Sequence, residues 1–213
     1  MGAAAGADRL VAILRREIDD ERVLEAIRRV PRDRFVPADL RDAAWDNAPL
    51  PIGRGQTISQ PLVVARMLEL LALRGTERVL DVGTGSGYHA ALLAALAAEV
   101  WSIERHPDLS AQAARDLRDA GVENVTLVVG DGSLGHPPAS PYDAINVAAA
   151  AARRVPPALE AQLSVGGRLV APVEAGDQRL VLVRRGPAGL WRSVLEPVRF
   201  VPLVDGYAGD ADV

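Results

Sequence analysis

The chain has 213 residues, of which 49% are hydrophobic and 24% are charged, a balance typical of globular domains. It contains no cysteine, which excludes a disulfide framework, a thiol nucleophile and a zinc–thiolate site. The formal net charge of −4 argues against a nucleic-acid backbone as the main partner. Because no apolar run is long enough to cross a bilayer and no export signal is recognisable, we expect a cytoplasmic protein.

Helices are predicted for most of the N-terminal part, which we delimit as residues 1–75. The small residues 1–7 predict a disordered start. From 8 to 30 apolar residues recur at helical spacing, and the acidic break Asp19-Asp20-Glu21 predicts two helices, with Asp19 or Asp20 as the N-cap of the second. Pro31 ends this helix, and 32–48 is predicted to be irregular with short helical turns.

Residues 50–61 combine prolines and glycines with uncharged hydrogen-bonding side chains, just before a predicted helix over 62–73. One interpretation is structural: Ser59 is the N-cap of this helix, and Pro61 occupies the favoured first turn. The other is functional: the polar side chains form the floor of a pocket and hold a carboxylate without a competing charge. The side chains in question are Gln56, Thr57, Ser59 and Gln60.

A glycine-rich loop follows the predicted strand 79–82 and precedes a predicted helix over 90–98. Strand, tight turn and helix are typical of the first βα unit of a doubly wound sheet, whose ligand binds at the turn. Gly83, Gly85 and Gly87 alternate, which does not match the G-x-G-x-x-G spacing of dinucleotide-binding folds. The loop suits a ligand without a pyrophosphate, such as the amino-acid part of S-adenosylmethionine; the alternative is a turn that binds nothing.

Two acidic residues end the next predicted strands. Glu104 follows strand 99–103, about 20 residues after the loop, where an acidic residue meets ribose hydroxyls in nucleoside-binding sheets. Asp131 lies between two glycines after strand 125–129, which suits an adenine-binding edge or an ordinary turn. Together with the loop, Glu104 is interpreted as a ribose acceptor.

The remaining pattern alternates helices and strands and ends in an antiparallel pair. We predict one domain, an α/β fold with a doubly wound, mostly parallel sheet, N-terminal helical decoration and C-terminal antiparallel strands. Within it, 76–185 is the cofactor-binding core and 186–213 the C-terminal strands and tail. The predicted elements are helix 109–120 ending at Gly121, strand 142–147, helix 155–163, strand 168–172 and strands 178–184 and 191–203 joined by the turn 186–189.

These motifs together resemble the protein-L-isoaspartate (D-aspartate) O-methyltransferase family. The resemblance covers nearly the whole chain, and 49–61 is its most specific part. It implies a Rossmann-like enzyme that transfers a methyl group from S-adenosylmethionine to the free carboxyl of L-isoaspartyl residues in damaged proteins, and it leaves open whether D-aspartyl residues are also substrates. The ester then closes to a succinimide, which starts repair. The matching segments are Val30–Val36, Ala44–Asn47, Pro49–Gly53, Gly55–Pro61, Val79–Tyr88, Gly130–Gly132, Pro141–Ile145, Gln162-Leu163, Gly166–Val170 and Phe200–Leu203.

The resemblance also implies roles for individual residues. Ser59 is the catalytic residue, and Thr57, Ile58 and Gln60 share the substrate site. The residues implied to contact S-adenosylmethionine or its product S-adenosylhomocysteine are Gly83, Thr84, Gly85, Glu104, Arg105, Asp131, Gly132 and Val204. No metal is expected. The expected partners are isoaspartyl proteins and peptides, with no nucleic acid or membrane, and the enzyme is expected to be a monomer.

The chemistry agrees with the lack of a His or Cys constellation in the sequence. A carboxylate is already ionised at neutral pH, so its methylation needs alignment of the reactants rather than a general base. Three histidines, His89, His106 and His136, are therefore interpreted as packing or surface residues. Two alternatives stay open: an enzyme of the same fold that modifies an Asp of a dedicated peptide precursor, and a non-catalytic cofactor-binding scaffold. Departures from the family pattern at Leu62, Ala148 and Glu174 leave the peptide preference open.

Overall fold

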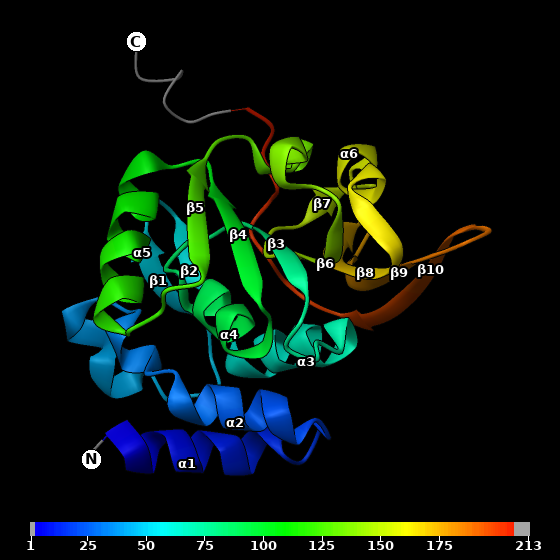
Figure 1. Ribbon diagram of the computed structural model, residues 1–213. Helices are drawn as coiled ribbons and strands as arrows, with labels where there is room; N and C mark the ends of the chain where they lie inside the picture. Colours follow the sequence, from blue (N-terminus) through cyan, green and yellow to red (C-terminus); the bar gives the residue numbers. More distant parts are fainter. Residues whose placement is uncertain (1–2, 207–213) are drawn as a thin grey trace.

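A twisted eight-stranded sheet forms the centre of the computed structural model, which describes residues 3–206 (Figure 1). The strand order is β10-β9-β8-β6-β3-β4-β5, with the short β7 beside β8. All pairs from β8 to β5 are parallel, whereas β9 and β10 pair antiparallel, which confirms the predicted fold class. The strands are β3 (Arg78–Val82), β4 (Glu99–Glu104), β5 (Val125–Val129), β6 (Tyr142–Val147), β7 (Ala151–Ala152), β8 (Leu163–Glu174), β9 (Gln178–Gly186) and β10 (Gly189–Pro197).

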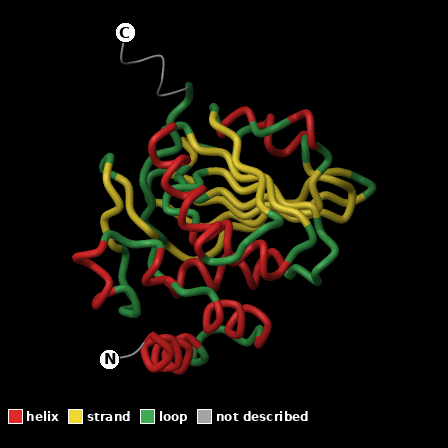
Figure 2. Tube along the Cα trace, turned by 60° about the vertical axis from the view of Figure 1, so that its left-hand side comes forward, coloured by secondary structure: helices red, strands yellow, loops and turns green. Residues whose placement is uncertain are grey.

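Helices cover both faces of the sheet, and a small antiparallel hairpin of β1 and β2 stands apart from it (Figure 2). Asp20 is the N-cap of α2, as predicted, because its carboxylate accepts from the backbone N–H of Arg22 and Val23. The elements are α1 (Ala3–Leu14), α2 (Glu21–Arg29), α3 (Pro61–Leu71), α4 (Tyr88–Leu96), α5 (Pro107–Asp119), α6 (Pro157–Ala161), β1 (Leu50–Gly53) and β2 (Gln56–Ile58). Short 3₁₀ turns at Arg32–Arg34 and Ala38–Ala43 fill the stretch predicted to be irregular.

The predicted disordered start is wrong for residues 3–7, which belong to α1; residues 1 and 2 lie outside the described chain. The small residues serve packing here. Gly6 lies so close to Trp45 that a Cβ built on it would be 2.5 Å from the indole Cδ1. A helix that approaches an aromatic ring this closely needs a residue without a side chain at the contact.

Two further predictions were wrong in their bounds. Strand 191–203 ends at Pro197, and the predicted helix 155–163 shrinks to Pro157–Ala161, because Leu163 already begins β8. The hairpin within 50–58 was not predicted as strands at all. The division of the chain at residues 75 and 185 stays a prediction.

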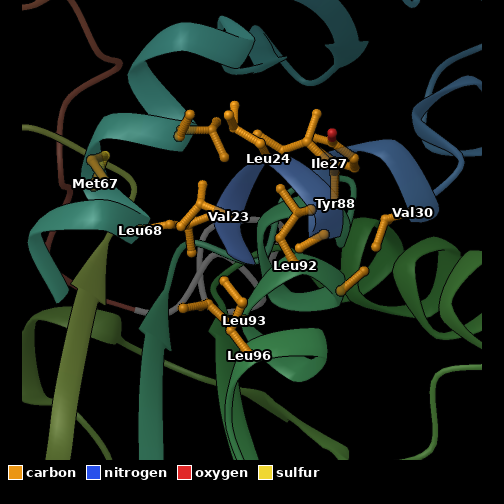
Figure 3. Close-up of a cluster of buried hydrophobic side chains, with 14 of the residues drawn as sticks. Val23, Leu24, Ile27, Val30, Met67, Leu68, Tyr88, Leu92, Leu93 and Leu96 are labelled. Atoms are coloured by element: carbon orange, nitrogen blue, oxygen red, sulfur yellow. The ribbon is translucent and has the colours of Figure 1, made fainter. Parts of the chain in front are cut away.

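The N-terminal helices are held by a shared hydrophobic core. Side chains of α2, α3 and α4 meet in it, including Leu24, Ile27, Leu68, Leu92 and Leu93 (Figure 3). Each of these side chains is at most 1% exposed, and burying one stabilises the fold by about 1.5–3 kcal/mol. The core therefore holds α2 and α3 against α4, the helix that follows the glycine loop. Among residues 3–206 no helix has the length and apolarity that crossing a membrane requires.

Candidate active site

The glycine loop lies at the carboxyl end of β3, where the chain turns into α4. Gly83, Gly85 and Gly87 adopt φ angles of +94°, +52° and +87°, a left-handed region in which a Cβ is strained. The backbone N–H groups of Gly83 and Thr84 both donate to the carbonyl of Ile103, at 2.9 and 3.1 Å. The loop is thereby bound to the neighbouring strand β4 and leaves a surface of bare backbone beside the sheet.

Glu104 ends β4 next to this loop and is only 6% exposed. One carboxylate oxygen accepts from the backbone N–H of Gly85 at 2.9 Å, and the other accepts from that of His106 at 3.0 Å. Each oxygen keeps a second lone pair, because a carboxylate oxygen accepts two hydrogen bonds. The carboxylate is therefore oriented by backbone donors and still able to accept from a ligand hydroxyl.

A buried polar network lies beneath the loop and joins β3, β4 and β6. Asp81 is the register partner of Ser102 on one side and of Asn146 on the other. Its carboxylate accepts from the Ser102 hydroxyl at 2.7 Å and from the Asn146 amide at 2.8 Å, and Ser102 also shares a hydrogen bond of 2.6 Å with the Thr84 hydroxyl. The network thus links the centre of the sheet to the glycine loop.

Burial is the main influence on the pKa of Asp81, which it raises to about 6. The hydrogen bonds from Asn146 and Ser102 lower this pKa, and the nearby charge of Glu104 raises it further. No sequence prediction identified this network. The available signal was one polar residue within the apolar run of each of three strands: Asp81, Ser102 and Asn146.

His89, in the first turn of α4, is buried and extends the network toward the site. Burial lowers its pKa to about 3, so the imidazole is neutral. Its Nδ1 lies 3.3 Å from the Asn146 amide nitrogen. Since that amide donates, the ring proton is assigned to Nε2, which has no partner among residues 3–206.

His136, in contrast, stacks on Trp101 with ring centroids 4.9 Å apart, as expected of a packing residue.

A cavity brings most of the predicted site residues together. Its volume is about 860 Å³ when the solvent-filled mouth is included. The glycine loop and β4 line one side, β2 and the following turn another, and the segment after β10 a third. The predicted residues among its lining are Thr57, Ile58, Ser59, Gly83, Thr84, Gly85, Glu104, Arg105, Gly132 and Val204.

Two predicted site residues do not line this cavity. Gln60 lines an adjacent groove, and its amide donates to the backbone carbonyl of Asn47 at 3.1 Å. Asp131 precedes Gly132 in the chain, and its carboxylate accepts from the Ser133 backbone N–H and hydroxyl and from the backbone N–H of Gly206, the last at 2.7 Å. Although burial acts to raise the pKa of Asp131, these hydrogen bonds lower it overall. Asp131 thus ties the chain after β10 to the turn that follows β5.

The structure separates the two interpretations of Ser59. The N-cap of α3 is Gln60 rather than Ser59, so the capping prediction was wrong. Asn47 takes over that task, because its side-chain oxygen accepts from the backbone N–H of Leu62 at 3.0 Å. The half-buried Ser59 hydroxyl has no hydrogen-bond partner within residues 3–206. It faces a cavity with its donor and acceptor capacity unused.

A family model described as protein-L-isoaspartate(D-aspartate) O-methyltransferase matches residues 6–208. The chain belongs to this family. Two curated relatives are similar over most of their length. A protein-L-isoaspartate O-methyltransferase 2 from Marinobacter nauticus is 55% identical over 192 residues, 89% of this chain and 87% of the relative. A protein-L-isoaspartate O-methyltransferase from Anaeromyxobacter dehalogenans is 57% identical over 190 residues, 87% of this chain and 90% of the relative.

Solved structures agree with the family assignment. A protein-L-isoaspartate O-methyltransferase superposes with a TM-score of 0.83 at 28% identity over 92% of this chain, which spans 65% of that protein. A Plasmodium falciparum protein described as a member of the same family, solved with S-adenosyl-L-homocysteine, gives a TM-score of 0.82 at 25% identity, covering 92% of this chain and 97% of its own. The predicted family and fold are therefore confirmed.

Proposed function

We propose that the cavity between the glycine loop and Ser59 is the site of methyl transfer to protein carboxyl groups. The chain is an S-adenosylmethionine-dependent protein-L-isoaspartate O-methyltransferase, and its family match over residues 6–208 is the observation that carries this conclusion. The residues fit the cofactor. Bare glycine backbone, a buried acidic strand end and the Nε2 of His89, which has no partner in the described part of the chain, surround one cavity. S-adenosylmethionine supplies a methyl group on a sulfonium, an activated leaving group.

On the cofactor side, the residues of this chain bind and orient. The backbone of Gly83–Gly85 approaches the amino-acid part without side chains in the way, and Glu104 accepts from ribose hydroxyls with its remaining lone pairs. Arg105 and Gly132 line the same side of the cavity. Asp131, whose carboxylate accepts from Ser133 and Gly206, lies beside the part of the site that binds the adenine ring. Val204 closes this end.

On the substrate side, Ser59 and Thr57 present neutral hydroxyl groups. Donation from them orients the substrate carboxylate without the strong ground-state stabilisation that a fixed cation would give the nucleophile. The carboxylate needs no base, so catalysis rests on holding oxygen and methyl in line and on excluding water. Ile58, Val201 and Leu203 contribute apolar surface to the same cavity. Gln60 acts from the adjoining groove.

The test is a methylation assay on matched peptides. One sequence is synthesised with L-isoaspartate, D-aspartate or L-aspartate at the same position, and methyl ester formation is measured with S-adenosylmethionine. We expect turnover of the isoaspartyl peptide and none of the L-aspartyl peptide. Equal turnover of both would overturn the substrate assignment, and binding of the cofactor without any ester would favour a non-catalytic scaffold.

The proposal includes the setting of the enzyme. It works as a monomer in the cytoplasm on damaged proteins and peptides, without a nucleic-acid or membrane partner. Support comes from the net charge of −4, which disfavours binding to phosphate backbones, and from the absence of cysteine. Size-exclusion chromatography with light scattering tests the monomer, since a dimer would elute with twice the mass.

A further inference from the structure

A groove continues from the catalytic cavity toward the segment that follows β10. Thr57, Ser59, Ala148 and Val201 line both hollows, so the groove begins where the reacting carboxyl group is expected. Its other lining residues are Pro49, Gln60, Val63 and Pro197–Phe200. Among these described residues, Arg199 is the one with an ionisable side chain.

The backbone after β10 determines where Arg199 points. Gln178 holds this segment, because its backbone carbonyl accepts from Val198 N–H at 2.9 Å and its side-chain amide bonds both backbone groups of Phe200. Val198 and Phe200 pack against the core. Arg199 lies between these two partly buried residues and is itself exposed, so its side chain projects away from the core.

Arg199 also lacks a countercharge. Within residues 3–206 neither its guanidinium nor its backbone has a hydrogen-bond or ion-pair partner. Its acidic neighbour Glu196 is already paired, at 2.8 Å, with Arg66 on α3. As far as residues 3–206 show, the groove thus presents Arg199 as a cation without an ion-pair partner among neutral and apolar side chains.

Resting on the proposed function, we propose that Arg199 is a specificity-determining residue: it pairs with a carboxylate on a residue that flanks the isoaspartyl residue and so favours acidic substrate segments. The groove leads from Ser59 to Arg199, which places the guanidinium beside the flanking chain of a bound peptide. Arg199 does not line the cofactor cavity, whereas Ser59 does, so the reacting carboxyl group is served by Ser59.

The experiment scans one isoaspartyl peptide with Glu, Gln or Lys, singly, at the three positions on either side of the damaged residue. For the unaltered enzyme we expect at least one position at which Glu lowers KM about two- to fivefold relative to Gln, the strength of an exposed ion pair, with kcat unchanged. Lys at that position raises KM. The preference weakens at about 1 M salt, where the Debye length falls to about 3 Å.

Three variants complete the test. Arg199→Ala removes the preference, Arg199→Glu reverses it toward Lys, and Arg199→Lys retains part of it. Arg16→Ala removes one exposed arginine after α1 and serves as the charge-matched control that keeps the preference. Circular dichroism and thermal unfolding verify that each variant is folded.

Three results would overturn the inference. The first is an unaltered enzyme that is indifferent to flanking charge, and the second is an Arg199→Ala enzyme with the same preference. The third is an equal loss of kcat/KM for all peptides in Arg199→Ala, since this would mean that Arg199 acts on the reacting carboxyl group. Failure to methylate any isoaspartyl peptide would instead contradict the proposed function.

Discussion

The acidic residues of the site are oriented before any ligand arrives. Glu104 accepts from two backbone N–H groups, and Asp131 accepts from Gly206 and Ser133. A side chain held in this way loses little further rotamer freedom on binding, which favours affinity. Ser59 differs, because its hydroxyl has no partner among residues 3–206. Substitution should therefore separate cofactor binding from substrate alignment.

Ser59→Ala tests the alignment of the substrate. Loss of one hydrogen bond to a carboxylate costs about 1.5–3 kcal/mol, so we expect kcat to fall roughly 10- to 100-fold. The affinity for S-adenosylhomocysteine, measured by calorimetry, should stay within about twofold because the cofactor contacts are elsewhere. Unchanged turnover would remove Ser59 from the mechanism.

Glu104→Gln tests the binding of the ribose. The amide retains one acceptor oxygen but loses the charge and turns the other acceptor into a donor that faces a backbone N–H. We expect the affinity for S-adenosylhomocysteine to fall by about 1–3 kcal/mol. Calorimetry measures this, and Glu99→Gln, at the opposite end of β4, is the matched control; equal affinities would contradict the ribose role.

Asp81→Asn tests the buried network through pH. The folded pKa of about 6 lies above the unfolded value of 3.8, so the folded state binds the proton more tightly. The stability from protonated Asp81 is fully present below pH 3.8 and is lost as pH rises through 6. Relative to the Asn variant, the free energy of unfolding of the unaltered protein should thus fall by about 3 kcal/mol over this window. Urea titrations at several pH values measure the difference, and a constant difference would refute the shift.

At the level of elements, the sequence predicted what periodicity and turn chemistry determine. The strands ending at Val82 and Glu104, the Asp20 cap and the glycine loop were all found in this way. The β1–β2 hairpin was missed because its strands are four and three residues long and its turn contains Arg54 at a φ of +53°, for which sequence gives little signal. These are features that tertiary context selects.

The site shows the same division. The loop and Glu104 follow from local pattern, but the network of Asp81, Ser102 and Asn146 depends on which strands are neighbours and in which register. The Asn47 contact with Leu62 spans 15 positions and likewise has no local signature. Long-range pairing is decided by the whole sheet and not by any one segment.

Gly6→Ala tests the packing of α1. In an exposed helix this change would stabilise by about 1 kcal/mol, but here the new Cβ would lie 2.5 Å from Trp45. Overpacking of this kind costs about 1–3 kcal/mol, so we expect a net loss of stability in urea titrations. In a Trp45→Ala background the same change should become neutral or stabilising. A gain of stability in the presence of Trp45 would show that the contact is loose.

For the whole molecule, the catalytic cavity is assembled from parts that are distant in sequence. Thr57 and Ser59 come from β2 and the turn after it, Gly83 and Glu104 from the carboxyl ends of β3 and β4, and Val204 from the segment after β10. A ligand that fills this cavity contacts all three regions at once. Binding should therefore stabilise the fold as a unit.

Thermal unfolding with S-adenosylhomocysteine measures this effect. A ligand at 100 times its Kd stabilises the folded state by about 2.7 kcal/mol. For a chain of this size we expect the midpoint to rise by about 5–10 °C. NAD at the same concentration is the control, because its pyrophosphate does not suit the alternating glycines. An equal shift with NAD would favour a dinucleotide-binding protein.

Thr57, Ser59, Ala148 and Val201 line both the cavity expected to hold the cofactor and the groove expected to hold the substrate peptide, so both ligands should contact these side chains. A change that one ligand causes in the arrangement of these side chains would alter the affinity for the other ligand, and by thermodynamic linkage the factor is the same in both directions. The affinities for the spent methyl donor and for the next damaged peptide should therefore be coupled through these four side chains.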